Sequence, residues 1–128
     1  MSPVALTMTL AEFASVNADA SYTLVRAGLR IWSCDVFPSV LVASVFAEVQ
    51  PNTLAVGTHA VKLTLLGSDG ASVLEQASLD VTDSRVETRF VIPIWLEARR
   101  VEQAALHLEV GGSLEARTTL SIRRAGSA

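Results

Sequence analysis

Two short turns, each next to a segment that alternates apolar and polar residues, constrain the fold of this chain most strongly. Asp69-Gly70 follows the alternating segment 61–65, and Gly111-Gly112 precedes the alternating segment 114–122. Alternation with a period of two places apolar side chains on one face of a strand, and glycine-bearing pairs of this kind are typical of tight hairpin turns. The sequence therefore predicts antiparallel hairpins with one buried face.

Similar segments continue along the chain. Further strands are expected at 4–10, 22–33, 40–49, 73–81, 86–95 and 105–110. Residues 96–104 suit one or two helical turns as well as a loop, because helix propensity does not decide so short a segment. Seven or eight strands joined by short turns predict two packed antiparallel sheets, which is an all-β sandwich of immunoglobulin-like type. A jelly roll or a small barrel is the alternative.

Gly28 and Pro93 each indicate a local irregularity in an expected strand. Gly28 can mark a bulge, after which the two faces of segment 22–33 exchange, so the outward placement of Trp32 depends on it. Pro93 cannot donate a ladder hydrogen bond, so its strand is expected at a sheet edge or at a bulge. The length of 128 residues matches one domain, and residues 123–128 are expected to form a flexible tail.

Charge and hydropathy limit the classes of partner. Ten basic and thirteen acidic residues give a net charge of −3, and the largest basic clusters are the pairs Arg99-Arg100 and Arg123-Arg124, which disfavours nucleic-acid binding. No apolar run reaches the roughly 18 residues of a membrane span, and the N-terminus lacks the pattern of a secretory signal. The single cysteine, Cys34, cannot form an internal disulfide. A cytoplasmic location follows as the expectation.

Residue types that could carry chemistry are few and scattered. A nucleophilic Cys34 would need a base, and the only histidines, His59 and His107, are distant in sequence. A lone cysteine among apolar residues is more simply a small hydrophobic residue. The two histidines have no short-spaced partner of the kind that zinc sites use, so they are interpreted as solvent-facing strand residues.

The carboxylates and the sequence motifs also give no indication of a catalytic or metal site. Asp69, Asp80 and Asp83 could meet at one end of a sandwich and bind calcium, but aspartates are also common turn residues, and that interpretation is favoured. The chain has no phosphate-binding loop, dinucleotide motif, metalloprotease motif or nucleophile elbow. We therefore expect a protein that is not an enzyme and has no catalytic residues, no cofactor and no metal.

The positive candidates are apolar and arginine-rich surfaces. Segment 40–49 is apolar on both faces, as expected for a strand that is covered twice or that faces a partner. Tryptophan and arginine are the residue types most enriched at interface hot spots. The alternative is that both tryptophans fill the core. The candidate partner-binding residues are Arg30, Trp32, Val40, Val42, Phe46, Arg89 and Trp95.

Three segments carry a resemblance to a known family. Residues 10–16 (LAEFASV), 22–28 (YTLVRAG) and 59–70 (HAVKLTLLGSDG) resemble a family of small bacterial β-sandwich proteins of uncharacterised function, common in actinobacteria. In that family an acidic residue and a Gly-Lys turn often occupy the first two segments. Here Glu12 stands for the acid and Ala20-Ser21 replaces Gly-Lys. The resemblance, over residues 5–124, implies a β-sandwich and a bacterial origin, and it brings no catalytic residues.

Three hypotheses of function follow from these observations. The favoured one is a non-enzymatic interaction or assembly module that binds a protein partner or associates with itself. The second is a sandwich that binds a small molecule or carbohydrate with loops at one end. The third is an enzyme that uses Cys34 or carboxylates.

Overall fold

The computed structural model describes residues 5–19 and 21–126, and in these ranges the chain forms nine strands and no helix. The chain thus contains, within the described residues, no helix that could cross a membrane. The strands are β1 (Leu6–Val16), β2 (Tyr22–Ala27), β3 (Ile31–Cys34), β4 (Ser39–Val49), β5 (Gly57–Gly67), β6 (Gly70–Val81), β7 (Thr88–Ala98), β8 (Glu102–Val110) and β9 (Leu114–Arg124).

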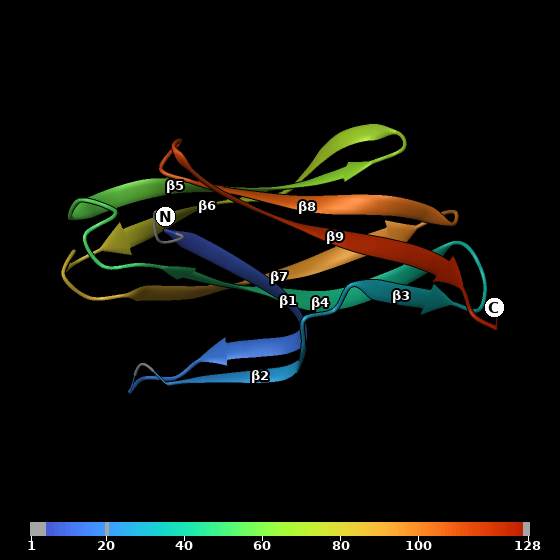
Figure 1. Ribbon diagram of the computed structural model, residues 1–128, viewed down its shortest axis with the longest axis horizontal. Helices are drawn as coiled ribbons and strands as arrows, with labels where there is room; N and C mark the ends of the chain where they lie inside the picture. The colour runs from blue at the N-terminus through green and yellow to red at the C-terminus, as the bar shows by residue number, and fades with distance from the viewer. Residues whose placement is uncertain (1–4, 20, 127–128) are drawn as a thin grey trace.

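The strands form two packed sheets, which Figure 1 shows as two layers. Sheet A has the order β2-β1-β4-β7, and sheet B has the order β3-β9-β8-β5-β6. All neighbours are antiparallel except β3 and β9, which run parallel. The order β1-β4-β7 opposite β9-β8-β5-β6 corresponds to strands A-B-E opposite G-F-C-C′ of immunoglobulin-like sandwiches. The predicted fold class is confirmed.

The core lies between the sheets and follows the alternation in the sequence. In β8, Leu106, Leu108 and Val110 are fully buried, whereas His107 and Glu109 between them are only partly covered. Larger buried aliphatic side chains from both sheets complete the same cluster, among them Leu10, Val45, Leu63 and Leu120. Thr64 is only 8% exposed, although its alternation with Leu63 and Leu65 places it on the outer face of sheet B.

The two hairpin turns have the expected positions. Gly67 pairs with Gly70, so Ser68 and Asp69 form a two-residue turn between β5 and β6. Val110 pairs with Leu114, so residues 111–113 connect β8 to β9. Gly111 and Gly112 both have positive φ, 65° and 78°, a conformation that side chains with a Cβ disfavour.

The predicted single strand 22–33 is wrong, because the chain changes sheets within it. It ends as β2 at Ala27, and β3 begins at Ile31 in the other sheet, beside β9. Gly28 adopts φ 80° at the break, and the backbone N–H groups of Gly28 and Leu29 both donate to the carbonyl of Leu10. The glycine thus marks a strand break rather than a bulge.

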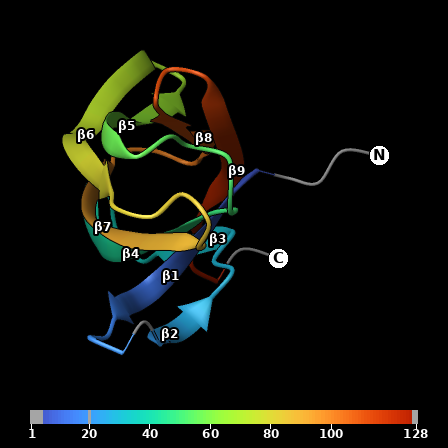
Figure 2. The ribbon, with the colours of Figure 1, turned by 90° about the vertical axis from the view of Figure 1, so that its left-hand side faces the viewer.

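The second half of β1 and the whole of β2 form a hairpin that bends away from the rest of sheet A. The first half of β1 pairs with β4 as far as Ala11 opposite Ser44, and the rest pairs with β2 as far as Val16 opposite Tyr22. Figures 1 and 2 show this β1–β2 hairpin on the side of sheet A that faces away from sheet B. The Tyr22 ring lies 4.8 Å from the ring of Phe46 in β4, so the hairpin adds a partial third layer.

Three local expectations are resolved in the last third of the chain. Pro93 lies in β7, which is an edge strand of sheet A, as its missing N–H indicated. Residues 99–101 connect β7 to β8, so segment 96–104 forms no helical turn. Arg123 and Arg124, expected in the tail, belong to β9 and pair with β3. Residues 127 and 128 of that expected tail lie outside the described residues.

The two glycines of the β8–β9 turn allow a matched test. Alanine at either position meets the cost of a left-handed backbone, about 1 kcal/mol. Only at position 111 would the new Cβ also lie 3.3 Å from the Leu54 Cδ2, whereas position 112 is open. Gly111→Ala is therefore expected to lower the free energy of unfolding more than Gly112→Ala does, as measured by urea denaturation. Equal losses would contradict this account of the turn.

Candidate interaction face and cleft

The outer face of sheet A is covered over only half of its length. Strand β4 is buried on both faces from Ala43 to Ala47, because sheet B covers one side and the β1–β2 hairpin covers the other. Phe46, beneath Tyr22, is only 2% exposed. Farther along the same outer face, beyond the hairpin, Val42 is 68% and Val40 is 48% exposed.

Strand β7 extends the uncovered half toward the sheet edge. Trp95 lies directly opposite Val42 in the β4–β7 ladder, and it is 59% exposed. Pro93, two residues earlier on the same face, is also exposed. We call the set Val40, Val42, Pro93 and Trp95 the β4–β7 face. Contiguous exposed apolar side chains of this kind mark contact areas in many soluble proteins.

Charged residues lie next to the β4–β7 face. Glu97 is opposite Val40 in the ladder, and the Arg99 Nε lies 2.7 Å from the Glu97 Oε1. This hydrogen bond raises the pKa of Arg99 above its ordinary value. An ion pair between Glu12 and Arg26, 3.4 Å apart, lies at the base of the β1–β2 hairpin. An apolar centre beside charged groups is the usual composition of a protein interface.

The seven residues predicted for partner binding fall into three places. Val40, Val42 and Trp95 lie together on the β4–β7 face. Phe46 and Arg89 belong to the same outer face, but the β1–β2 hairpin contacts both of them through Tyr22. Arg30 is exposed beside β3, at the far edge of sheet B, and Trp32 is half-buried against the core. The alternative that both tryptophans fill the core does not describe Trp95.

Arg89 anchors the hairpin through a small polar cluster. Its Nε lies 3.2 Å from the Glu48 Oε2, and its Nη2 lies 2.8 Å from the Glu87 Oε1. The guanidinium also lies 4.9 Å from the centre of the Tyr22 ring, a cation–π distance. A hydrogen bond that the protonated Glu87 carboxyl donates to Glu48, together with burial, raises the pKa of Glu87, and these effects outweigh the opposing effect of Arg89. Two neighbouring carboxyl groups thus share one cation.

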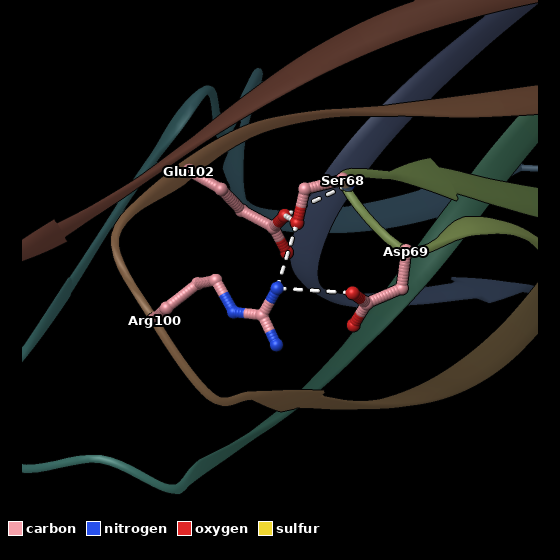
Figure 3. Close-up of polar contacts among 4 residues, drawn as sticks. All are labelled: Ser68, Asp69, Arg100 and Glu102. Carbon is pink, nitrogen blue, oxygen red and sulfur yellow. Dashed lines mark hydrogen bonds and ion pairs between the residues drawn. The ribbon is translucent and has the colours of Figure 1, made fainter.

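A cleft of about 550 Å³ lies between the edge strands β6 and β7. Trp95 and Leu96 line it from sheet A, and Leu65, Val73 and Leu74 line it from sheet B. Polar groups from two turns close one end (Figure 3): the Arg100 Nη1 donates to the Ser68 Oγ at 3.2 Å and to the Asp69 Oδ1 at 3.0 Å. Glu102 accepts hydrogen bonds from the N–H and the hydroxyl group of Ser68.

The other residues singled out in the sequence do not assemble into one site. Cys34 is 2% exposed and belongs to the core. The His59 Nε2 donates to the Ala55 carbonyl at 2.7 Å. Asp80 accepts a hydrogen bond from Thr58 at the start of β5, and Asp83 pairs with Arg85 after the end of β6. Asp69 lies in the turn that precedes β6, at the opposite end of that strand.

Comparison with protein-family models, with curated proteins and with solved structures finds no match. The β4–β7 face and the β6–β7 cleft are therefore assigned from their own geometry. Sequence reasoning missed the contribution of Arg100 and Glu102 to the cleft. The adjacent cations Arg99-Arg100, which follow an edge strand, were the available signal for it.

The carboxyl pair at Arg89 predicts a specific pH dependence. Because the folded protein raises the pKa of Glu87, this group favours folding most below its unfolded pKa, and that contribution is lost as the pH rises through its folded pKa. Glu87→Gln is expected to remove this loss. The free energy of unfolding of the variant, relative to wild type, should therefore increase between pH 4 and pH 7 in urea titrations.

Glu75→Gln is the control for this experiment, since Glu75 is exposed on β6 and has no part in the cluster. If the free energy of unfolding of Glu87→Gln, relative to wild type, falls as the pH rises, the ion pair between Glu87 and Arg89 dominates. That result would overturn the raised pKa of Glu87.

Proposed function

We propose that this protein is a non-enzymatic interaction or assembly module that binds protein through the β4–β7 face. The observation that carries the proposal is the direct pairing of Val42 with Trp95 on the uncovered half of sheet A, where both side chains are more than half exposed. The part of the same outer face around Phe46 is buried under the β1–β2 hairpin. A cover over the part around Val40 and Val42, supplied by another protein surface, would complete the burial of β4.

The composition of the face supports a protein as the occupant. Tryptophan gives a large, stiff contact area with little loss of side-chain entropy, and it is strongly enriched at binding hot spots. The flanking Glu97 and Arg99 satisfy each other at 2.7 Å, so they can stay at the rim without a buried, unpaired charge. A net charge of −3 favours a protein over a nucleic acid as the partner.

A charge placed at the centre of the face tests the proposal. Val42→Asp is expected to abolish association, because a desolvated carboxylate without a partner is costly at an interface. Val56→Asp is the matched control, since Val56 is 63% exposed in the loop before β5. Light scattering after size exclusion, at several concentrations, measures self-association. Affinity capture from the native host, compared among the three proteins, measures binding of other chains.

The expected result is a dimer or a captured protein that wild type and Val56→Asp share and that Val42→Asp loses. A wild-type protein that is monomeric at all concentrations, with the same captured proteins as Val42→Asp, would refute the proposal. Retained secondary structure, measured by circular dichroism, separates loss of binding from loss of fold.

The β6–β7 cleft supports a second candidate function, the binding of a small polyhydroxylated molecule such as a saccharide. Its volume of about 550 Å³ lies within the usual range of ligand sites. It combines the exposed ring of Trp95 with donors and acceptors that are already held in place by the Ser68, Asp69, Arg100 and Glu102 network. An aromatic platform with converging polar groups suits a ligand that has one apolar face and many hydroxyl groups.

A thermal-shift screen with soluble saccharides tests this second function. A ligand that binds the folded state raises the melting temperature, and Arg100→Ala is expected to remove that rise because it releases Asp69 and Ser68. Val42→Asp should leave the rise intact, which separates the cleft from the β4–β7 face. The absence of any shift across neutral and acidic saccharides would count against the cleft as a ligand site.

A location and a family membership belong to the same proposal. The cytoplasm is the proposed location, and it agrees with a single cysteine that is held in the core. Membership of the bacterial β-sandwich family is likewise proposed, on the three resembling segments and the common fold class.

A further inference from the structure

We propose that His107, Glu109 and Glu115, on the outer face of sheet B, form a binding site for a divalent transition-metal ion of the zinc class. One nitrogen or oxygen atom from each of the three side chains lies within 4.8 Å of the other two. The site is separate from the β4–β7 face, which lies on sheet A, and from the β6–β7 cleft, whose lining does not include these residues.

The strand register places the three side chains together. His107 and Glu109 are two residues apart in β8, so they share one face of the strand. Glu115 lies directly opposite Glu109 in the β8–β9 ladder. Since β8 is flanked by β5 on its other side, the three backbone positions are fixed by hydrogen-bonded strands rather than by a loop.

The two glutamates flank the His107 ring. The His107 Nδ1 lies 3.5 Å from the Glu109 Oε1, and the Nε2 lies 3.5 Å from the Glu115 Oε1. Good hydrogen bonds between such atoms are about 2.7–3.2 Å long, so neither contact is a hydrogen bond that an ion would have to displace. Because one ion binds a single ring nitrogen, one glutamate side chain would have to rotate toward the nitrogen that faces the other. Zinc bonds of about 2.0–2.2 Å would then hold neighbouring ligand atoms about 3.3–3.6 Å apart.

The local charge also favours a cation. Two carboxylates directly opposite each other in a ladder are unfavourable, and among the described residues each has an ion pair with His107 alone. Lys62 opposite Glu109 and Arg117 opposite His107 are the cations next to them in the ladder, and neither forms an ion pair with these carboxylates in the described part of the chain. A bound divalent ion would neutralise both glutamates.

The donor set selects the class of ion. An imidazole with two carboxylates suits zinc and its neighbours in the first transition row, whereas magnesium prefers oxygen ligands and retains its water. The side chain of His107 is 21% exposed and that of Glu109 is 38% exposed, so two of the ligands are partly covered by the sheet. Three protein ligands leave one tetrahedral position for water or for a group from another molecule.

Titration of the full chain with ZnCl₂ tests the site. Zinc at roughly ten times its dissociation constant is expected to raise the melting temperature by about 5 to 6 °C, with one ion bound per chain by calorimetry. His107→Ala and Glu115→Gln should each remove the shift. His59→Gln is the control for the other histidine, and it should retain the shift. Glu115 is exposed, so its substitution provides a variant whose folding is not in question.

Cobalt and magnesium give two independent readouts. Co²⁺ should develop visible absorption bands with wild type and His59→Gln, and much weaker bands with His107→Ala. Mg²⁺ at the same concentration should leave the melting temperature unchanged. Equal stabilisation by Mg²⁺ would show simple screening of the glutamates and would overturn the proposal. So would a zinc shift that persists in both His107→Ala and Glu115→Gln, or the absence of zinc binding at submillimolar concentration.

Discussion

The structure depends on one constraint: β4 is apolar on both faces, and around Phe46 both faces are covered. Sheet B covers the inner face with the aliphatic side chains of β5, β8 and β9. The outer face would otherwise expose Phe46, and the β1–β2 hairpin covers it by turning back at the point where β1 leaves β4. Burial of a phenylalanine side chain contributes about 1.5–3 kcal/mol, a large share of the stability of a domain of this size.

The polar contacts are arranged so that this cover stays in place. Tyr22 lies between Phe46 and Arg89, and Arg89 is itself held by Glu48 and Glu87. The hairpin is thus attached through the Tyr22 ring, which contacts Phe46 and also Arg89. Arg89 is paired in turn with Glu48 and Glu87. Because Glu48 and Arg89 face each other in the β4–β7 ladder, the attachment point belongs to the body of the sandwich rather than to the hairpin.

Local patterns in the sequence were sufficient to predict most of the strands, and nonlocal contacts explain what was missed. Alternation and turn residues are patterns among residues close in the sequence. They predicted the β5–β6 and β8–β9 hairpins, because the paired strands of a hairpin are adjacent in the sequence. The change of sheet at Gly28 depends on two hydrogen bonds to Leu10, which no pattern within segment 22–33 contains. The residues on both sides of Gly28 alternate as in a continuous strand, and the structure marks the break by positive φ at Arg26 and at Gly28, 49° and 80°.

The candidate sites likewise divide into features that local patterns predict and features that depend on nonlocal contacts. The apolar residues on both faces of segment 40–49 predicted a strand that is covered twice or faces a partner, and the pairing with β7 places Val42 beside Trp95. That segment could not show where the cover ends, because the cover comes from residues 12–27. The cleft network joins Ser68 to Arg100 and Glu102 across more than thirty positions, and His107 meets Glu115 only through the β8–β9 register. A single sequence does not contain these distances.

The partial third layer also explains why a sandwich of low charge retains an exposed apolar face at all. A hairpin long enough to cover Val40, Val42 and Trp95 would have to extend along the whole of β4, yet β2 has only six residues and its partner segment of β1 ends at Val16. Polar residues at positions 42 and 95 would improve solubility at small cost to stability, since substitution of exposed strand positions has a small effect. Val42 and Trp95 are the apolar side chains that the proposed second protein surface would cover, beside the already buried Phe46.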